Sequence, residues 1–411
     1  MSPSLQSDRL TWENEELASV EAGTKFQVSA FDFRSDITTS ASGRQFQAIL
    51  GVSSNDGWTA SGSKVFEDKM ADLAGRAASL FMISSTMSNQ VAIRTHLNRP
   101  PNGIICDARS HIMHQEVGAI GQLSGALPLA IYPQNGLYLT LEDIEENIVL
   151  SDGTDTCTCP TRLLHLENPL GGVVMPVEEM KRIKQYADKH SLTVHMDGAR
   201  LWEAVACGAG NLEAFCSQVH SLNLCLTKGL GGSVGSFLVG DSEFIRHAKW
   251  VRKSLGGSMR QPGWVAAAGW AAVGEVFGQD PSGQDAWRLR RTHDLARRLA
   301  KHWEDLGGRL VVPQQTNMVW LDLDAAGIDE DSWESGGQER GILLHCSRLV
   351  THYQISDEAV VCLEQYMADM MQNLQQRRRL QTRIPRPEAV ARLAKTMRRG
   401  LELAHLQGYR K

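Results

Sequence analysis

The chain has 411 residues, of which 42% are hydrophobic and 22% charged, and its formal net charge is -5 at pH 7. This composition is typical of a globular protein, and the length favours two domains over one small core. A slightly acidic chain gives no reason to expect a nucleic acid or a membrane surface as partner. Because it shows neither a secretory signal nor an apolar run of about 18 residues, we expect a cytoplasmic protein.

The eight cysteines are scattered along the chain, and only Cys157 and Cys159 lie close together. One intervening residue is too few for a zinc-type or thioredoxin-type pair. Buried thiols in a reducing compartment are the preferred interpretation, and the sequence indicates no metal site.

From about residue 66 to residue 240 the pattern alternates between helical and strand periods, which predicts an α/β fold with a largely parallel sheet. The first helix carries its apolar residues on one face: Phe66, Met70, Leu73 and Ala77. A short buried strand is predicted at 80–83, and the polar run Ser-Ser-Thr-Met-Ser-Asn at 84–89 joins it to another helix.

A second amphipathic helix is predicted after Pro176, with its apolar face formed by Val177, Met180, Ile183 and Ala187. Strands are predicted at 192–196, 221–227 and 236–239; the first leads to Asp197 and the second to Lys228. Ligands of open α/β sheets bind outside the carboxyl ends of the strands, so these residues point to a site.

After about Pro281 the sequence becomes helical and charged, with one predicted strand at 317–322. We therefore expect an N-terminal segment at 1–45 that contributes to the active site, a large α/β domain at 46–280 and a smaller α+β domain at 281–411. The basic stretch at 375–411 is interpreted as a solvated helix face or a subunit contact.

Lys228 follows a buried strand and precedes the glycine-rich run Gly-Leu-Gly-Gly at 229–232. Lysines usually avoid such positions because desolvation penalises their charge. A lysine that forms a Schiff base with an aldehyde must be neutral to react, so the position suits that chemistry. The alternative is a lysine that extends from the strand end to solvent.

Asp197 lies 31 positions before Lys228, since 228 − 197 = 31. A carboxylate at a neighbouring strand end can pair with the protonated pyridine nitrogen of pyridoxal 5′-phosphate (PLP) and keep the ring an electron sink. An aspartate that only caps a helix is the alternative. Together, Lys228 and Asp197 favour a PLP enzyme.

The polar run at 84–89 predicts a helix N-terminus, where backbone N–H groups and hydroxyls bind anions such as the cofactor phosphate. Simple capping by Ser84 or Ser85 is compatible with this role. The glycines at 229, 231, 232 and 235 do not match the G-x-G-x-x-G spacing of a dinucleotide site.

Three further residues are candidates for the site. For His111, stacking on the pyridine ring is the functional interpretation; it depends on the resemblance described below, because an isolated histidine is more often structural. Arg200 and Arg348 offer the bidentate fork that grips a substrate carboxylate, although arginines are also common on surfaces.

From about residue 31 to residue 353 the chain resembles the threonine aldolase family of PLP enzymes. The matching motifs are Phe-Arg-Ser-Asp at 33–36, the run at 84–89, Ser-His at 110–111, Leu-Glu-Asn at 166–168, His-Met-Asp-Gly-Ala-Arg at 195–200, Thr-Lys-Gly-Leu at 227–230, Gly-Gly-Ser-Met-Arg-Gln at 256–261 and Arg-Leu-Val-Thr-His at 348–352. The resemblance implies a PLP-dependent transferase-like fold (fold type I).

The resemblance also implies roles for single residues. Lys228 is the Schiff-base lysine, Asp197 the pyridinium partner and His111 the stacking ring. The phosphate is bound by Ser85 and Thr86, the substrate carboxylate by Ser35, Arg200 and Arg348. Lys253 and Arg260 match positions that reach the phosphate from a neighbouring subunit, which implies a homodimer or homotetramer with shared active sites.

The sequence departs from the family at Glu-Asn-Pro-Leu-Gly-Gly, residues 167–172. Family aldolases have Glu-Asn-Thr-His there, and the histidine contacts the β-hydroxyl of threonine. Leu170 takes its place and cannot accept the proton that cleavage of the Cα–Cβ bond requires. Ser85 stands where glycine is usual and still supplies a donor.

An apolar group over Cβ suits the methyl group of alanine, and fungal alanine racemases that supply D-alanine for cyclic-peptide synthesis also resemble this family. The sequence therefore favours an alanine racemase, in which Lys228 removes the Cα proton and a second group returns one on the opposite face. That donor stays open between His111, a water and an unassigned group. A threonine or allo-threonine aldolase is the alternative, and a family member that binds without turnover is a third.

Overall fold

The computed structural model describes residues 29–52 and 62–382. Seven strands form the main sheet: β1 Ala78–Met82, β2 Gly103–Asp107, β3 Leu127–Ile131, β4 Thr161–Glu167, β5 Thr193–Gly198, β6 Ser221–Cys225 and β7 Ser236–Gly240. A second, two-stranded sheet pairs β8 Met318–Trp320 with β9 Arg348–Val350.

The helices divide between the two sheets. Those before and around the main sheet are η1 Ser29–Phe31, η2 Asp36–Thr38, α2 Gly43–Gly51, α3 Lys64–Leu73, α4 Ser85–His96, α5 His111–His114, α6 Ala119–Ser124, α7 Leu141–Asn147, α8 Val177–Lys189, α9 Leu201–Ala206, α10 Leu212–Cys216, α11 Ser242–Ser254 and α12 Gly263–Val276. Those of the C-terminal part (residues 287–382) are α13 Trp287–Asp305, α14 Leu323–Ala326, α15 Glu330–Glu339 and α16 Asp357–Thr382.

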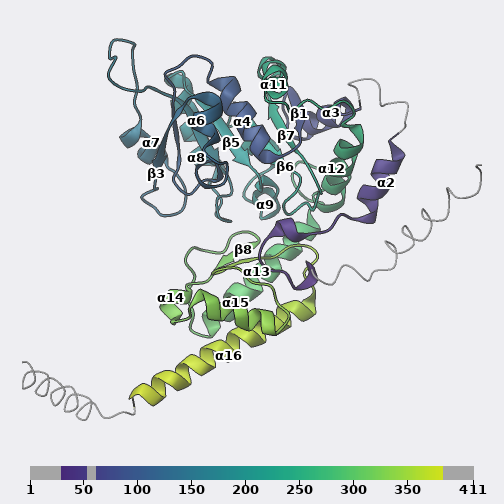
Figure 1. Ribbon diagram of the computed structural model, residues 1–411, viewed down its shortest axis with the longest axis vertical. Helices are drawn as coiled ribbons and strands as arrows, with labels where there is room; N and C mark the ends of the chain where they lie inside the picture. The colour runs from purple at the N-terminus through teal and green to yellow at the C-terminus, as the bar shows by residue number, and fades with distance from the viewer. Residues whose placement is uncertain (1–28, 53–61, 383–411) are drawn as a thin grey trace, which may run out of the picture.

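The strand order of the main sheet is β1-β7-β6-β5-β4-β2-β3. Neighbouring strands from β3 to β6 run parallel, and β7 runs antiparallel to both β1 and β6. The prediction of an α/β fold with a mostly parallel sheet is confirmed. The carboxyl ends of β4, β5 and β6 consequently meet at one edge, which faces the C-terminal part (Figure 1).

The strand ends differ slightly from their predicted positions. Asp197 lies within β5, because the backbone N–H of Asn168 donates to its carbonyl and extends the strand ladder (3.0 Å). β6 ends at Cys225, so Lys228 lies in the turn beyond the strand. The strand predicted at 317–322 is shortened to β8.

The two predicted amphipathic helices are α3 and α8. In α8 the expected apolar face is buried at Met180, Ile183 and Ala187. α3 ends at Leu73, because Gly75 adopts a positive φ of 62° and reverses the chain. Ala77 therefore lies outside the helix, contrary to the predicted face.

The buried apolar side chains form separate clusters. The largest surrounds the main sheet and includes Leu289 at the start of α13, whereas Leu299 and Trp303 of the same helix belong to the core of the C-terminal part. Phe33, from the N-terminal segment, is fully buried in this second core. It is held by backbone hydrogen bonds to Leu343 and Val350, so the segment crosses from the C-terminal part to the cavity described below.

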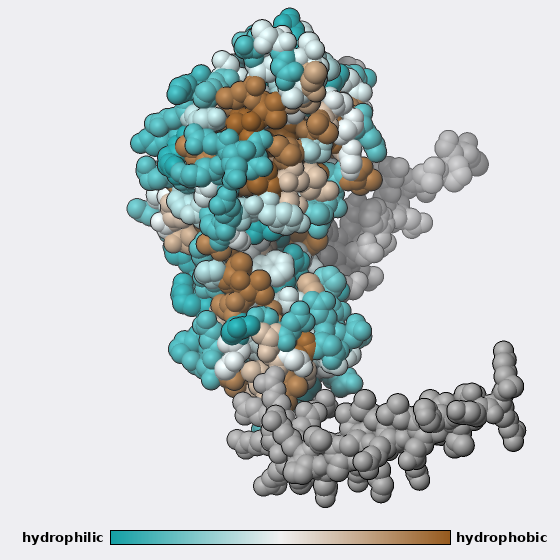
Figure 2. Space-filling model, turned by 90° about the vertical axis from the view of Figure 1, so that its left-hand side faces the viewer, coloured by the Kyte–Doolittle hydropathy of each residue, from teal (hydrophilic) through white to brown (hydrophobic). Residues whose placement is uncertain are grey.

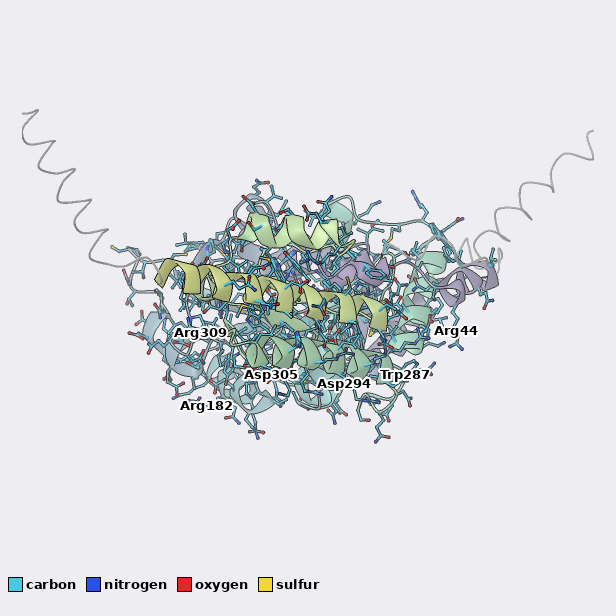
Figure 3. The ribbon with its side chains drawn as sticks, turned by 90° about the horizontal axis from the view of Figure 1, so that it is seen from below. Arg44, Arg182, Trp287, Asp294, Asp305 and Arg309 are labelled. Atoms are coloured by element: carbon cyan, nitrogen blue, oxygen red, sulfur yellow. The ribbon has the colours of Figure 1, made fainter. Side chains whose placement is uncertain are left out.

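In the C-terminal part, α16 packs across α13 and α15 (Figures 1 and 3). It covers the beginning of the basic stretch predicted from residue 375 and ends at Thr382; residues 383–411 lie outside the described residues, as do 1–28. None of the helices in 29–52 and 62–382 has both the length and the apolar character needed to cross a membrane. Figure 2 shows apolar patches on an otherwise hydrophilic surface.

Candidate active site

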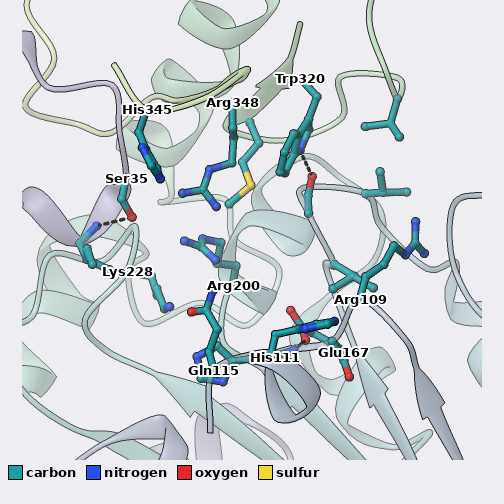
Figure 4. Close-up of a pocket in the computed structure, with 18 of the residues that line it drawn as sticks. Ser35, Arg109, His111, Gln115, Glu167, Arg200, Lys228, Trp320, His345 and Arg348 are labelled. Carbon is teal, nitrogen blue, oxygen red and sulfur yellow. Dashed lines mark hydrogen bonds between the residues drawn. The ribbon is translucent and has the colours of Figure 1, made fainter. Parts of the chain in front are cut away.

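A cavity of about 930 Å³ lies between the carboxyl ends of the central strands and the C-terminal part (Figure 4). Its lining combines positively charged side chains, Arg34, Arg109, Arg200, Lys228 and Arg348, with an apolar wall formed by Ile37, Leu170, Val173, Val311, Val312, Met318 and Trp320. This size and this mixture of groups are typical of a small-molecule site.

Lys228 reaches the cavity from the turn after β6. The backbone N–H of Gly231 donates to the carbonyl of Lys228 (2.8 Å) and fixes the turn. Gly229 has no room for a side chain, since a Cβ atom there would lie 2.1 Å from Oε1 of Glu203. The backbone of Lys228 is thus held rigidly, while no acceptor among the described residues is hydrogen-bonded to its amine.

Asp197 lies near the carboxyl end of β5; it does not line the cavity and is only 2% exposed. Its Oδ2 accepts a hydrogen bond from Nδ2 of Asn89 (2.7 Å), and its Oδ1 accepts from Nδ2 of Asn223 (3.0 Å) and the N–H of Ala199 (2.9 Å). Three N–H donors from different elements hold the carboxylate in one orientation.

His111 begins α5 and lines the cavity. Its backbone N–H donates to Oε2 of Glu167 (2.8 Å), and its Nδ1 lies 2.8 Å from Oε1 of Glu116. This contact with Glu116 raises the pKa of His111 despite partial burial. The side-chain atoms of His111, Glu116 and Asp197 cluster within 4.8 Å, but Asn89 bridges the two carboxylates, so the cluster is a hydrogen-bond network.

The polar run at 84–89 forms the N-terminus of α4, where the side chain of Ser84 accepts the N–H of Met87 (3.1 Å). The N–H groups of Ser85 and Thr86 lie in the first turn and have no intrahelical acceptor. Oγ of Ser85 is buried without a partner among the described residues. These free donors fit an anion such as a phosphate. Neither residue lines the cavity, but Asn89 of the same helix reaches Asp197.

Arg200 lines the cavity but is already paired with Asp36, to which its Nε and Nη2 donate (2.7 and 2.6 Å). Burial would raise the pKa of Asp36, yet Arg200 and Lys228 outweigh it and lower the pKa to about 2. Two of the five N–H donors of Arg200 are thus occupied within the protein, and the two N–H groups of Nη1 and the second N–H of Nη2 are left for a ligand.

Arg348, by contrast, has no carboxylate partner among the described residues. Its Nη2 donates to the carbonyl of Arg34 (3.1 Å), its Nε is buried without a partner, and its guanidinium lies 5.7 Å from the ring centre of Trp320. Burial and the charge of Arg200 lower its pKa. Ser35 lies on the same side of the cavity, where its Oγ accepts the N–H of Ile37 (3.4 Å).

Leu170 lies in the loop 168–175, which connects β4 to α8, and its side chain lines the cavity. Backbone hydrogen bonds in both directions join Leu170 to Val173 (3.1 and 3.0 Å). The C-terminal part holds the loop from outside, since Nε1 of Trp320 donates to the carbonyl of Gly171 (2.8 Å) and Oγ1 of Thr316 donates to that of Gly172 (2.9 Å) (Figure 4).

Lys253 and Arg260 do not line the cavity, and both are exposed. The segment between them approaches the N-terminus of α4, because a Cβ atom on Gly257 would lie 2.6 Å from Sδ of Met87. The structure thus places this segment beside the candidate phosphate site of the same chain, with the two cations directed to the surface.

Sequence reasoning missed several residues of the site, namely Asn89, Glu116, Glu167 and Asn223. Glu167 could have been found, because it ends an apolar strand as Asp197 does and lies opposite it in the β4–β5 register. His165 and His195, in contrast, are fully buried, and burial lowers the pKa of each, which indicates structural roles.

A family profile described as beta-eliminating lyase matches residues 32–326, a span that includes Lys228, Asp197 and His111. The chain belongs to the beta-eliminating lyase family. The resemblance to threonine aldolases is thereby confirmed, because threonine aldolases are among the relatives of this chain.

Three relatives illustrate the range of the family. The chain is 42% identical to an aldolase, vrtJ, of Penicillium aethiopicum over 90% of this chain and 93% of that protein. It is 38% identical to the alanine racemase TOXG of Cochliobolus carbonum over 83% and 87% of the two chains. It is 39% identical to a probable low-specificity L-threonine aldolase of Schizosaccharomyces pombe over 81% and 85%.

Among solved structures, a putative L-allo-threonine aldolase of Listeria monocytogenes superimposes with a TM-score of 0.65 at 20% identity, covering 86% of this chain and 99% of that one. Together with the mostly parallel sheet, this confirms the fold type I architecture. The family and its fold establish PLP as the cofactor of this protein, and the free donors of Ser85 together with the buried carboxylate of Asp197 fit such a group.

Proposed function

We propose that the protein is an alanine racemase that interconverts L- and D-alanine. The observation that carries this proposal is Leu170, which presents an apolar side chain to the cavity that Lys228 enters. Hydrogen bonds to Val173, Trp320 and Thr316 fix the loop. The loop therefore does not readily move to bring a polar side chain into the place of Leu170 at this wall. A methyl group is well accommodated there, whereas the hydroxyl of threonine would lose hydrogen bonds to water.

In this proposal Lys228 would bind the cofactor covalently, and Asp197 would pair with its ring nitrogen. His111 would stack on the face of the ring, and Ser85 and Thr86 would bind the phosphate. PLP, when bound, supplies an electron sink for negative charge at Cα. Lys228, in its neutral form, takes the Cα proton on one face.

The carboxylate of alanine is bound by Arg348 with Ser35. Arg348 offers unpaired donors, whereas two donors of Arg200 are committed to Asp36. Arg200 contributes its remaining N–H donors and its charge. Leu170 excludes water around Cβ, which disfavours reactions that need a proton acceptor at that position.

The second candidate is a threonine or allo-threonine aldolase. The aldolase relatives favour it, and so does the presence of His111 and His114 in the lining. Nε2 of His114, however, lies 2.6 Å from the carbonyl of Ala108, and Nδ1 of His111 is taken by Glu116.

Proton NMR of the PLP-loaded protein in deuterated water separates the two candidates. With L-alanine, the racemase loses the Cα proton signal while D-alanine accumulates; with L-threonine, it forms no acetaldehyde. Rapid formation of glycine and acetaldehyde with inert alanine would establish the aldolase instead.

Replacing Leu170 by histidine is expected to raise threonine cleavage relative to alanine racemisation, because it supplies a proton acceptor over Cβ. General acid–base groups contribute about 10²- to 10⁴-fold, so a rise of this ratio by about 10-fold or more is the expected result. Leu170→Met, which keeps the wall apolar, serves as control and should leave the ratio near that of the wild type. An unchanged ratio in Leu170→His would show that residue 170 does not face Cβ.

Replacing Arg348 by alanine is expected to weaken carboxylate recognition by about 1.5–3 kcal/mol, the scale of charge-assisted hydrogen bonds. This corresponds to a rise of about 10- to 150-fold in KM for alanine. Arg298→Ala on the surface of α13, where Arg298 pairs with Glu364, is the control and should leave KM unchanged. Equal KM values for Arg348→Ala and Arg298→Ala would show that a residue other than Arg348 binds the carboxylate of alanine.

We further propose a homodimer or homotetramer with shared active sites, in which Lys253 and Arg260 reach the phosphate of a neighbouring subunit. Their exposure beside α4 supports this role, as do exposed apolar side chains such as Phe46 of α2 and Trp264 of α12. The division into domains at 46–280 and 281–411 is likewise a proposal, supported by the separate apolar clusters.

A further inference from the structure

Glu167 ends β4 and lines the cavity, two strands away from the turn that carries Lys228. β5, which carries Asp197, lies between β4 and β6. The side chains of Glu167 and Lys228 therefore enter the cavity from opposite sides of Asp197. Figure 4 shows Lys228 and Glu167 on opposite sides of the cavity, with Arg200 between them.

One carboxyl oxygen of Glu167 is held and the other is available. Oε2 accepts the backbone N–H of His111 (2.8 Å). Oε1 accepts no hydrogen bond from the residues that the structure describes, and the side chain is part of the cavity lining. A carboxyl group with one anchored and one free oxygen is well placed to exchange a proton with a ligand.

The surroundings of Glu167 favour its protonated form. Removal from water and the nearby charge of Asp197 raise its pKa to about 8, although the N–H and ring of His111 and the charge of Arg200 act in the opposite direction. Cys106 and Arg109 also face it. These surroundings favour the protonated form of Glu167, which is the form that a proton donor needs.

We propose that Glu167 is the second acid–base group of the racemase, acting on the face of Cα opposite to Lys228. This inference rests on the proposed function. In one direction the amine of Lys228 takes the Cα proton; the O–H bond of Glu167 then breaks as a new Cα–H bond forms, which leaves a carboxylate. In the other direction the carboxylate of Glu167 takes the proton and Lys228 returns one. Exchange with solvent resets both groups.

Each histidine of the lining already has one ring nitrogen engaged. Nδ1 of His111 is bound to Glu116, and His111 is also assigned to the ring face of the cofactor. Nε2 of His114 lies 2.6 Å from the carbonyl of Ala108, and Nδ1 of His345 lies 3.2 Å from Glu334. Among the carboxyl groups of the described residues, Glu167 is the one that lines the cavity.

The test uses the PLP-loaded Glu167→Gln protein in deuterated water with L-alanine and D-alanine in separate tubes. Glutamine keeps an acceptor for the N–H of His111 but cannot transfer a proton. We expect exchange of the Cα hydrogen of one enantiomer only, at a rate within about 10-fold of wild type, while racemisation falls by about 10²-fold or more. Glu167→Asp should recover part of the racemisation.

Glu179→Gln is the matched control, because Glu179 also accepts a backbone N–H, from Leu141 (2.7 Å), but lies outside the cavity. It should racemise alanine as the wild type does. Inversion at a wild-type rate in Glu167→Gln, or exchange of both enantiomers, would overturn the role of Glu167. Wild-type protein that exchanges neither enantiomer would overturn the proposed function and with it this role.

A measurement without cofactor or substrate tests the protonated state separately. A carboxyl with a raised pKa makes the folded state less stable as pH rises from its ordinary value of 4.5 to about 8, because the unfolded chain releases the proton more readily. The melting temperature of the wild-type apoprotein should thus fall over this range relative to that of Glu167→Gln. Parallel pH profiles of the two proteins would contradict a protonated Glu167, whatever the outcome with alanine.

Discussion

Replacing Lys228 by alanine is expected to abolish covalent attachment of PLP and to reduce alanine racemisation by roughly 10⁴-fold or more, the scale on which removal of a covalent catalytic group acts. The loss has two parts, because in the proposed function Lys228 provides both the amine that binds the aldehyde and the base for one face of Cα. No other lysine among the described residues lines the cavity, so none can take the place of Lys228. Borohydride reduction followed by mass spectrometry of the denatured protein measures the attachment.

Lys301→Ala provides the control, because Lys301 is exposed on α13 and pairs only with Asp305. It should retain the reduced adduct and full turnover. An adduct that survives denaturation in Lys228→Ala would assign the covalent link to a different lysine.

Replacing Asp197 by asparagine is expected to lower the affinity for PLP and to reduce turnover by about 10²- to 10³-fold. Removing one member of a buried charge pair costs about 3–5 kcal/mol, which sets this scale. The NH₂ group of the new asparagine would also face hydrogen-bond donors in place of acceptors, because Asn89, Asn223 and Ala199 all direct N–H groups at the carboxylate. The measurements are cofactor titration by absorbance and the turnover number with saturating alanine.

Asp143→Asn is a suitable control. Asp143 is buried to the same degree as Asp197 but forms the capping box of α7 with Thr140, outside the cavity. This variant should lose stability while it retains normal affinity for PLP. If Asp197→Asn bound PLP and turned over as well as Asp143→Asn, Asp197 would not be the partner of the ring nitrogen.

Much of the fold followed from local patterns. The period of α8, the strand at β1 and the helix start after Ser84 depend on neighbouring residues, so they could be predicted from the sequence. The antiparallel direction of β7 could not, because it depends on pairing with β1, which lies more than a hundred residues earlier in the chain. The break of α3 before Ala77 depended on one positive φ at Gly75, which a helical pattern does not reveal.

The site could be predicted only in part, for a similar reason. Residues that follow strands, such as Lys228 and Asp197, share an edge of the sheet by topology. The pairing of Arg200 with Asp36 joins residues 164 positions apart, and no spacing rule indicates it. Because of that pairing, we propose Arg348 rather than Arg200 as the main ligand of the substrate carboxylate.

The loop 168–175 has a consequence for the history of this enzyme family. The hydrogen bonds that hold the loop use its backbone and the side chains of Asn168, Gln315, Thr316 and Trp320, and none of them uses the side chain of Leu170. Residue 170 can therefore vary without loosening the loop. The leucine codons CUU and CUC each differ from a histidine codon by a single nucleotide, so one point mutation of such a codon exchanges the two side chains that the proposed function places over Cβ. A lineage could pass between cleavage and racemisation in such a step, with the architecture around it unchanged.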